Sequence, residues 1–293
     1  MVQINGLKSD NTFVPKQALA PTPQLYDELV GDGMKELAKA TVAEIGRIEK
    51  RSVILDVGCG TGAGTAAVAE AVSTDVLLTL SIKGVDLSKA ALDIYRQKVL
   101  EQGLPAQAIL ADAGNLTAAL KEASFSHVIG TALLFFLPED GIPAIEEMRR
   151  TLRPGGIAAL NTWAYVPNMG PIRIASQETR PSGTPEIRAG MNKWPDLEFL
   201  KSTIQKAGFP SNKITVIQRN VYCCAAEFDH YANTLWSFIG GTTSVGCLHP
   251  DEEHWEQAIK IVKHELIKTD GFELLEDERV RLRFIANIAV VTR

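Results

Sequence analysis

The sequence predicts an α/β domain built on a mostly parallel β-sheet with helices on both faces. Short apolar runs alternate with amphipathic stretches through the middle of the 293-residue chain, which is typical of parallel strands joined by crossover helices. The first run, ILDVGCGTGAGT at residues 54–65, passes through a glycine-rich turn into a helix-forming stretch. Such strand–turn–helix units place a ligand above the start of the helix.

Five strands are expected in the first part of the chain, each followed by a helix or a turn. They cover residues 52–57, 82–86, 106–112, 125–134 and 156–164. The helices between them are expected at 61–72, 88–103 and 143–152. In the second helix Ser88 is placed to cap the start and Gly103 to end it. Ala91, Ile94, Tyr95 and Lys98 are expected to share one face of it.

The alternation stops after residue 165. Residues 166–195 are rich in proline and glycine and predict a long irregular connection. A helix at 196–207, a sixth strand at 213–225 and a seventh at 281–293 restore the pattern. Two helix-like stretches, 228–239 and 251–268, lie between the last two strands and form an insertion.

Composition narrows the class of protein. A hydrophobic content of 45% over this length is enough for a full core. The net charge of −5 and the pI of about 5.6 give no positive field for a nucleic acid. The longest apolar runs, such as ALLFFL at 132–137, are shorter than the ~20 residues of a membrane helix. With no signal-peptide pattern at its start, the chain is expected to be soluble and cytoplasmic, with a small-molecule partner.

The cysteines give no sign of a metal centre. Cys59, Cys223, Cys224 and Cys247 form no CxxC pair and no metal-ligand spacing. We expect neither a metal nor a disulfide, and interpret these residues as small buried side chains.

Three carboxylates indicate the ligand, because each ends a strand at the edge of the sheet where ligands bind in such folds. Asp86 can accept both hydroxyls of a ribose, and Asp112 can accept a hydrogen bond from the exocyclic amine of adenine. Asp56, in front of the glycine-rich turn, would repel a pyrophosphate and attract an ammonium group. The pattern therefore favours adenosine joined to a cationic amino acid, and disfavours a dinucleotide oxidoreductase.

These segments resemble the class I S-adenosylmethionine-dependent methyltransferases. LDVGCGTG, GVDLS, ADA and LRPGG match four motifs of that family in order, within residues 50–165. The resemblance implies a Rossmann-like seven-stranded sheet whose last strand is antiparallel and lies between the fifth and sixth. It implies S-adenosylmethionine as cofactor, with Leu87 stacking on adenine. The implied cofactor-binding residues are Asp56, Gly58, Cys59, Gly60, Gly62, Asp86, Leu87, Asp112, Ala113 and Thr131.

The resemblance also divides the chain, which we expect to form one domain over residues 1–293. Residues 1–49 would be an amino-terminal helical cap, 50–165 the cofactor-binding core, and 166–293 the substrate side with a lid insertion at about 227–270. Tyr26 resembles the tyrosine that many small-molecule members carry in a helix over the cofactor; an ordinary helix-surface aromatic is the alternative.

The sequence indicates only the chemical class of the molecule that accepts the methyl group. After the fourth strand, TALLFFLPED lacks the Asn/Asp-Pro-Pro-aromatic motif of base-amine methyltransferases and carries Phe135 and Phe136 where small-molecule members have histidines. Substrate contacts are expected from Phe135, Trp163, Tyr165 and Trp236, with a core role as the alternative for the phenylalanines and Trp236. NTWAYVPN, at 161–168, resembles fungal natural-product methyltransferases and implies an intermediate of secondary metabolism.

The expected reaction moves a methyl group to an O, N, S or C atom of an apolar or aromatic small molecule. A general base is needed only for a protonated acceptor, and His230 and His249, both in the insertion, are the candidates. A structural or surface role is the alternative for each histidine. Two other functions stay open: a methyltransferase-like fold that catalyses a cyclisation or rearrangement, and a non-enzymatic regulatory partner.

Overall fold

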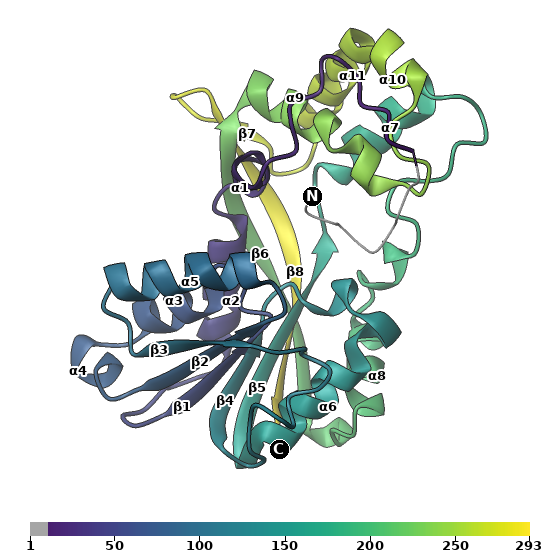
Figure 1. The fold of residues 1–293 in the computed structure, drawn as a ribbon. Coiled ribbons are helices and arrows are strands. Elements are labelled where there is room, and N and C mark those ends of the chain that lie inside the picture. The colour runs from purple at the N-terminus through teal and green to yellow at the C-terminus, as the bar shows by residue number, and fades with distance from the viewer. Residues whose placement is uncertain (1–10) are drawn as a thin grey trace. The chain divides into compact units, whose positions relative to one another are not determined.

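The computed structural model describes residues 11–293, which form two compact units (Figure 1). Unit 1 holds the described part of residues 1–33 together with Tyr165–Lys193 and Asn220–Ile285. Unit 2 holds Met34–Ala164, Trp194–Arg219 and Ala286–Arg293. The single domain over 1–293 and its three expected parts stay a prediction.

One sheet contains all seven expected strands and an additional short one. Its order is β3-β2-β1-β4-β5-β8-β6, with β7 paired to β8. The strands are β1 (Val53–Val57), β2 (Ser81–Asp86), β3 (Ala106–Leu110), β4 (Phe125–Gly130), β5 (Leu152–Tyr165), β6 (Ile214–Glu227), β7 (Glu273–Leu274) and β8 (Arg279–Thr292). The two-residue β7 was not expected from the sequence. The fourth strand ends four residues earlier than predicted, because the chain turns at Thr131 into a short 3-10 helix, η1 (Leu134–Phe136).

Register confirms the predicted topology. β1 pairs in parallel with β2 and β4, and Asp56 lies level with Gly84 and Ile129. β8 lies between β5 and β6 and runs antiparallel to β5, since Gly155 N–H donates to Arg293 O at 3.0 Å and Arg293 N–H donates to Gly156 O at 2.9 Å. Every residue of β4 is buried, which explains why this central strand reads as an apolar run rather than an alternation.

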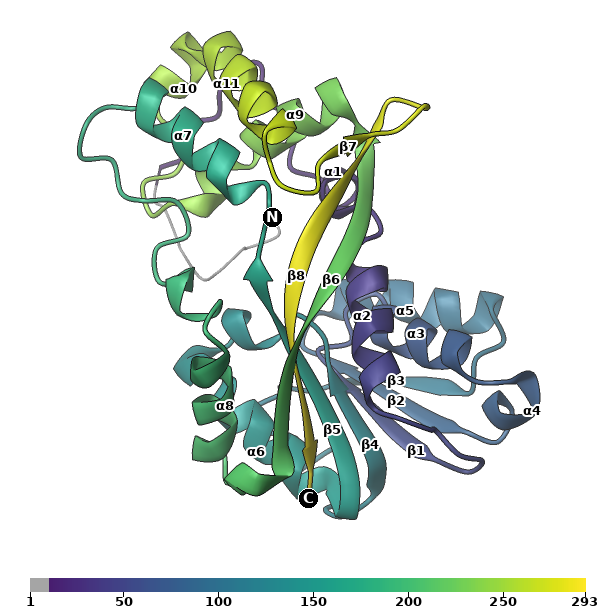
Figure 2. The same ribbon diagram turned by 180° about the vertical axis from the view of Figure 1, so that it is seen from behind.

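Helices cover both faces of the sheet in unit 2. Figures 1 and 2 show α2, α3 and α5 on one face and α6 and α8 on the other. The helices are α2 (Gly33–Glu44), α3 (Ala63–Ala71), α4 (Thr74–Leu77), α5 (Lys89–Glu101), α6 (Ile142–Thr151) and α8 (Leu197–Lys206). One apolar cluster joins α2 and α3 to β1 and β2 through residues such as Val42, Val68, Ile54 and Ile82.

Ser88 caps α5 as predicted, since its Oγ accepts from Ala91 N–H at 3.2 Å. The buried residues of the helix are Leu92 and Tyr95, while Ile94 is 41% exposed and Lys98 is exposed. Leu92 and Tyr95 pack against Cys59 in the glycine-rich turn.

Unit 1 is mainly helical. It contains α1 (Pro23–Val30), α7 (Met169–Thr179), α9 (Phe228–Ser237), α10 (His249–Glu253) and α11 (Trp255–Ile267). Its core joins α7, α9 and α11 through residues such as Ile172, Trp236 and Val262. Trp255, Ala258, Val262 and Leu266 form the buried face of α11.

Two expectations for this unit are corrected. The segment predicted as irregular contains α7, an eleven-residue helix with Gly170 and Pro171 in its first turn. Proline is tolerated there, because the N–H groups of the first turn form no hydrogen bond within a helix. The single helix expected at 251–268 is two helices, which begin at His249 and Trp255 and meet at His254.

None of the helices in the described part of the chain is both long and apolar enough to cross a bilayer.

Candidate functional site

The glycine-rich turn joins β1 to α3 in unit 2, and its three alternate glycines serve different purposes. Gly58, Gly60 and Gly62 all have positive φ, at 65°, 51° and 100°. A Cβ on Gly58 would lie 2.5 Å from Leu133 Cδ1, and one on Gly62 would lie 3.1 Å from Tyr95 Cδ2. A Cβ on Gly60 would meet no heavy atom within 4 Å. Gly60 is therefore the position of the turn at which a ligand can approach the backbone.

Asp86, at the end of β2, ties this turn to the neighbouring strand. Its Oδ2 accepts from Gly60 N–H at 2.9 Å and its Oδ1 from Ser88 N–H at 2.8 Å. Cys59 N–H donates to Val85 O at 2.9 Å, and the Cys59 side chain is buried. Each oxygen of Asp86 keeps a second lone pair. The carboxylate can thus accept from a diol while it holds the turn.

Asp56, which precedes the turn in the sequence, is buried against the start of α3. The residue is 1% exposed, and its Oδ2 accepts from Thr65 N–H at 2.8 Å and from Thr65 Oγ1 at 2.9 Å. Burial raises its pKa to about 6, against the opposing effect of the two bonds from Thr65. The carboxylate fixes the first turn of α3, and its expected contact with an ammonium group stays a prediction.

Thr65 and Tyr95 are positioning residues that the sequence reasoning did not include. Thr65 Oγ1 lies 2.9 Å from Tyr95 Oη. The ring of Tyr95 fills the space that a Cβ on Gly84 would need, since that Cβ would be 2.6 Å from Cζ. A glycine in the middle of an apolar strand was the available signal, because it often marks a close approach of another group.

The remaining predicted cofactor residues lie at the carboxyl ends of β2, β3 and β4. Leu87 is 70% exposed. Asp112 is exposed and its Oδ1 accepts from Gly114 N–H at 2.9 Å, while Ala113 is buried. Thr131 Oγ1 is buried and has no hydrogen-bond partner. Because parallel strands of one sheet end on the same side, these residues share one edge with the glycine-rich turn.

The loop after β4 is held by a buried amide. Asn161 of β5 accepts from Ala132 N–H at 2.8 Å and donates through Nδ2 to Thr41 Oγ1 at 2.7 Å. Ala132 has a φ of 51°, a strained value for a residue with a side chain. Asn161 thereby fixes the backbone next to Thr131. Its position in the quoted NTWAYVPN stretch gave no hint of this role.

Aromatic rings follow the same loop. The Phe135 ring centroid lies 4.6 Å from that of Phe136 and 6.5 Å from that of Trp194, which is buried and packs edge-on against Phe199 at 5.1 Å. Phe136 is 44% exposed, while Phe135 and Trp163 are partly buried. Trp194 was not predicted here, because nothing in its local sequence connects it with the fourth strand.

Unit 1 holds the other predicted residues. His230 Nε2 lies 2.8 Å from Glu28 Oε2, so that α9 and α1 are joined by this pair. His249 is exposed and its ring lies 4.2 Å from that of Phe13. Trp236 is fully buried in the core of the unit, and its Nε1 has no partner.

The two predicted tyrosines of unit 1 are both partly buried. Tyr26 packs edge-on against Phe238 with centroids 6.2 Å apart, and burial raises the pKa of its hydroxyl. Burial also raises the pKa of Tyr165.

Comparison with known proteins agrees with this geometry. Residues 54–156, from β1 to the start of β5, match a family model described as a methyltransferase domain. This stretch of the chain is therefore similar to a methyltransferase domain, as the sequence motifs led us to expect.

Two fungal methyltransferases are also similar to this chain. Methyltransferase ktnA of Aspergillus niger is 27% identical over 228 residues, which cover 68% of this chain and 74% of that protein. Methyltransferase tpcH of Aspergillus fumigatus is also 27% identical, over 64% of this chain and 67% of that protein.

A solved structure shares the fold. It is a phosphoethanolamine N-methyltransferase 2 of Haemonchus contortus in complex with phosphomonomethylethanolamine and S-adenosylhomocysteine. The match has a TM-score of 0.51 at 16% identity and covers 92% of this chain and 56% of that one.

Three features of unit 2 fit S-adenosylmethionine, the cofactor that the sequence resemblance implies. Gly60 leaves open space above the turn. Leu87 exposes an apolar surface suited to a flat ring at the end of β2. Thr131 holds a buried hydroxyl without a partner, and buried polar groups normally have one.

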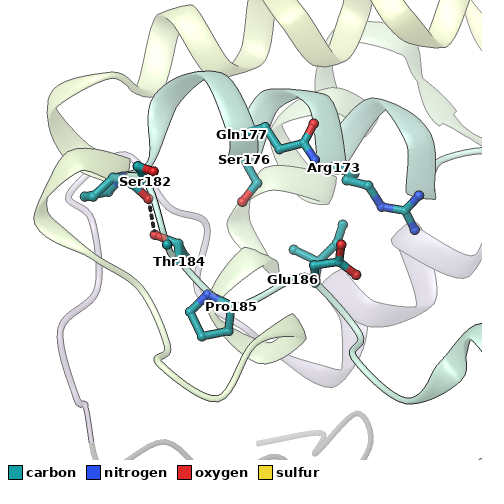
Figure 3. Close-up of a pocket in the computed structure, with 10 residues that line it drawn as sticks. Arg173, Ser176, Gln177, Ser182, Thr184, Pro185 and Glu186 are labelled. Atoms are coloured by element: carbon teal, nitrogen blue, oxygen red, sulfur yellow. Dashed lines mark hydrogen bonds between the residues drawn. The ribbon is translucent and has the colours of Figure 1, made fainter.

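A separate cavity of about 300 Å³ lies in unit 1, outside the methyltransferase domain match (Figure 3). Arg173 and Gln177 of α7 line it together with Thr184 and Glu186 of the following loop. None of the predicted cofactor, substrate or catalytic residues lines this cavity.

Proposed function

We propose that the protein methylates an O, N, S or C atom of an apolar or aromatic small molecule, an intermediate of secondary metabolism. The acceptor forms a bond to the methyl carbon, the carbon–sulfur bond of the sulfonium breaks, and S-adenosylhomocysteine leaves together with any proton of the acceptor. The carrying observation is that Phe135, Phe136 and Trp194 gather beside the end of β4, on the unit that holds the cofactor edge. Rings at such a site favour an apolar, planar acceptor.

We assign the cofactor to the residues of the sheet edge. Asp86 would accept from the ribose hydroxyls, Leu87 would pack on the adenine ring and Asp112 would accept from its amine, while Gly60 lets the ligand reach the backbone. When bound, the cofactor supplies a methyl carbon that is already activated as a sulfonium. What the chain adds is alignment and exclusion of water.

His230 is proposed to accept the proton where the acceptor is a phenol or an acidic carbon. Its bond to Glu28 favours the tautomer with the proton on Nε2, which leaves Nδ1 as the base. A carboxylate that orients an imidazole in this way is a common arrangement for a general base. His249, whose ring packs on Phe13, is the second candidate.

The cofactor assignment is tested first, by calorimetric titration with S-adenosylhomocysteine and with NAD. We expect micromolar binding of the former and none of the latter. Asp86→Ala should weaken S-adenosylhomocysteine binding tenfold or more, because a charged acceptor contributes ~1.5–3 kcal/mol. Asp93→Ala, which removes an exposed carboxylate paired with Arg96 on α5, is the matched control and should bind as the wild type does. Equal affinity of the Asp86 and Asp93 variants would refute the assigned site.

The acceptor class is tested with labelled methyl groups. The protein is incubated with methyl-labelled S-adenosylmethionine and a panel of substituted phenols, aromatic amines and aliphatic amines, and transfer is counted. Label should move to aromatic acceptors, and His230→Gln should lower transfer to phenols more than transfer to neutral amines, which need less help from a base. Transfer to polar aliphatic amines alone would contradict the proposed substrate class.

A further inference from the structure

A buried amide lies in the last strand of unit 2, where the neighbouring side chains are apolar. Asn287 of β8 stands between Ala286 and Ile288, and all three residues are 0% exposed. A polar side chain is unfavourable in such a place unless its donors and acceptors are paired. The partners of Asn287 therefore indicate what the amide does there.

The amide of Asn287 holds the chain just before α8. Its Nδ2 donates to Trp194 O at 3.0 Å and to Pro195 O at 3.1 Å. Its Oδ1 accepts from Gln218 Nε2 at 2.9 Å. Because the two carbonyl oxygens can only accept, they fix the amide with its nitrogen toward them. All of these residues belong to unit 2, so the contact joins β8 and β6 to the start of α8 within one unit.

The backbone at Trp194 is restricted by its own sequence as well. Trp194 precedes Pro195, and a proline ring disfavours the helical conformation for the residue before it. One residue later Asp196 caps α8, because its Oδ1 accepts from Glu198 N–H at 2.9 Å. The proline, the cap and the amide of Asn287 thus act on three consecutive residues, and together they leave the backbone at Trp194 little freedom.

The ring of Trp194 packs against the rings that follow β4. It is 3% exposed and lies edge-on to Phe135 and to Phe199, with centroids 6.5 Å and 5.1 Å apart. The Phe135 ring in turn lies 4.6 Å from that of Phe136, which is 44% exposed. Trp194 therefore supports the two phenylalanines from the interior of the protein, and the phenylalanines form the accessible part of the cluster.

We propose that Asn287 is a positioning residue for the methyl acceptor. By holding the backbone at Trp194 it fixes the indole against Phe135, and the indole keeps Phe135 and Phe136 in an arrangement on which a flat ring can stack. The amide thereby sets the preference of the site for planar aromatic acceptors over saturated ones of the same size. This inference rests on the proposed function, in which the acceptor lies at these phenylalanines.

The test measures this preference by calorimetric titration in the presence of S-adenosylhomocysteine, with 1-naphthol and its saturated counterpart 1-decalol as probes. The wild type should bind 1-naphthol more tightly than 1-decalol. Asn287→Leu removes both donors at nearly the same volume. It should weaken 1-naphthol about tenfold and change 1-decalol little, because a displaced ring loses stacking more than simple apolar contact. S-adenosylhomocysteine should bind this variant as it binds the wild type.

Coupling to Trp194 separates a positioning role from a merely structural one. Trp194→Leu should lose the preference for 1-naphthol to the same extent, and adding Asn287→Leu to it should cause no further loss, because the amide acts through the indole. The spectroscopic readout is the fluorescence of Trp194, taken as the difference that Trp194→Phe makes in each background. It should resist acrylamide quenching in the wild type and become quenched in Asn287→Leu.

The matched control is Thr151→Val, which removes a buried hydroxyl of the same unit that donates to Glu147 O at 2.8 Å. It should keep the preference, and a loss there as large as in Asn287→Leu would overturn the inference. Asn287→Ser, which keeps one donor and leaves room for water, replaces Asn287→Leu if the latter does not fold. Unchanged preference in the folded Asn287 variant would overturn the inference alone. Failure of the wild type to bind 1-naphthol, with S-adenosylhomocysteine bound, would overturn the proposed acceptor class as well.

Discussion

Single residues show that glycine has more than one purpose in the turn after β1. Gly58 and Gly62 make room for Leu133 and Tyr95, which are parts of the protein. Gly60 faces open space, so no neighbouring atom of the protein requires its missing side chain. The G-x-G-x-G spacing alone gives these three positions the same weight, and only the neighbouring atoms separate them.

This difference predicts opposite outcomes for two alanine variants. Gly60→Ala should reduce cofactor affinity at least tenfold with a modest loss of stability, about 1 kcal/mol for a positive φ. Gly58→Ala should mainly destabilise the fold, because its Cβ would meet Leu133. Calorimetry with S-adenosylhomocysteine and urea unfolding report the two effects separately.

The control is Gly46→Ala. Gly46 also has a positive φ, 83°, and a Cβ there would meet no atom within 4 Å. The variant should lose as much stability as Gly60→Ala and keep full affinity. If it lost affinity as well, the effect of Gly60→Ala would come from backbone strain and not from the ligand.

At the scale of elements, a buried polar chain connects β1, α3 and α5. Asp56, Thr65 and Tyr95 are linked by hydrogen bonds of 2.8–2.9 Å, and a Cβ on Gly64 would lie 2.7 Å from Asp56 Oδ1. The strand and its two helices are thereby fixed beneath the glycine-rich turn. Such a network holds its members in one geometry, and it lowers the stability of the fold when the buried Asp56 carboxylate is ionised.

Because ionised Asp56 destabilises the fold, the free energy of unfolding should depend on pH. Because the folded-state pKa of Asp56 is about 6 and its ordinary value is 3.8, the folded state binds the proton more tightly than the unfolded chain. The contribution of this group to stability therefore rises as the pH falls from 7 to 4. Asp56→Asn should add up to about 3 kcal/mol to the free energy of unfolding at pH 7 and close to nothing at pH 4. Urea unfolding at both pH values checks this, and a gain that does not change with pH would contradict it.

A second contact between elements lies in unit 1, where Arg180 at the end of α7 pairs with Asp251 of α10. Removing one partner leaves the other charge buried and unpaired, so Asp251→Leu alone should lower the free energy of unfolding by ~3–5 kcal/mol. The double variant Arg180→Met, Asp251→Leu should recover much of this loss. The exposed pair Lys263–Asp229 is the control, and Asp229→Ala should change stability by less than about 1 kcal/mol. Thermal and urea unfolding measure all three.

For the whole molecule, the chain passes between the two units five times: at the start of α2, within β5, after Lys193, within β6 and within β8. The edge that we assign to the cofactor belongs to unit 2, whereas His230 and His249 belong to unit 1. Cofactor binding should therefore report on the folded state of unit 2.

Cofactor binding should stabilise the protein by mass action. At one hundred times its dissociation constant, S-adenosylhomocysteine should raise the free energy of unfolding by ~2.7 kcal/mol. The measurement is urea unfolding with and without the ligand, with NAD at the same concentration as control. A similar shift with NAD would indicate binding that does not depend on the amino-acid part.

Much of the fold could be predicted, because strands, turns and caps leave local patterns. The order of seven strands, the cap at Ser88 and the position of the carboxylates follow from alternation and from short-range chemistry. α7 was missed, because Gly170 and Pro171 read as breakers unless they fall in the first turn of a helix. The burial of Leu92 in α5 could not be predicted, because its neighbour Cys59 comes from a distant turn.

The sequence by itself determined the resemblance to a methyltransferase domain, the sheet edge and the residues that end the strands there, since motifs and periodicity are local. The tertiary structure decided which of these residues bond to other parts of the fold and which face open space. Asp56 accepts from Thr65, Gly60 alone of its three glycines meets open space, and Arg180 pairs with Asp251. The physical reason is that burial and pairing depend on atoms contributed by residues far apart in the chain.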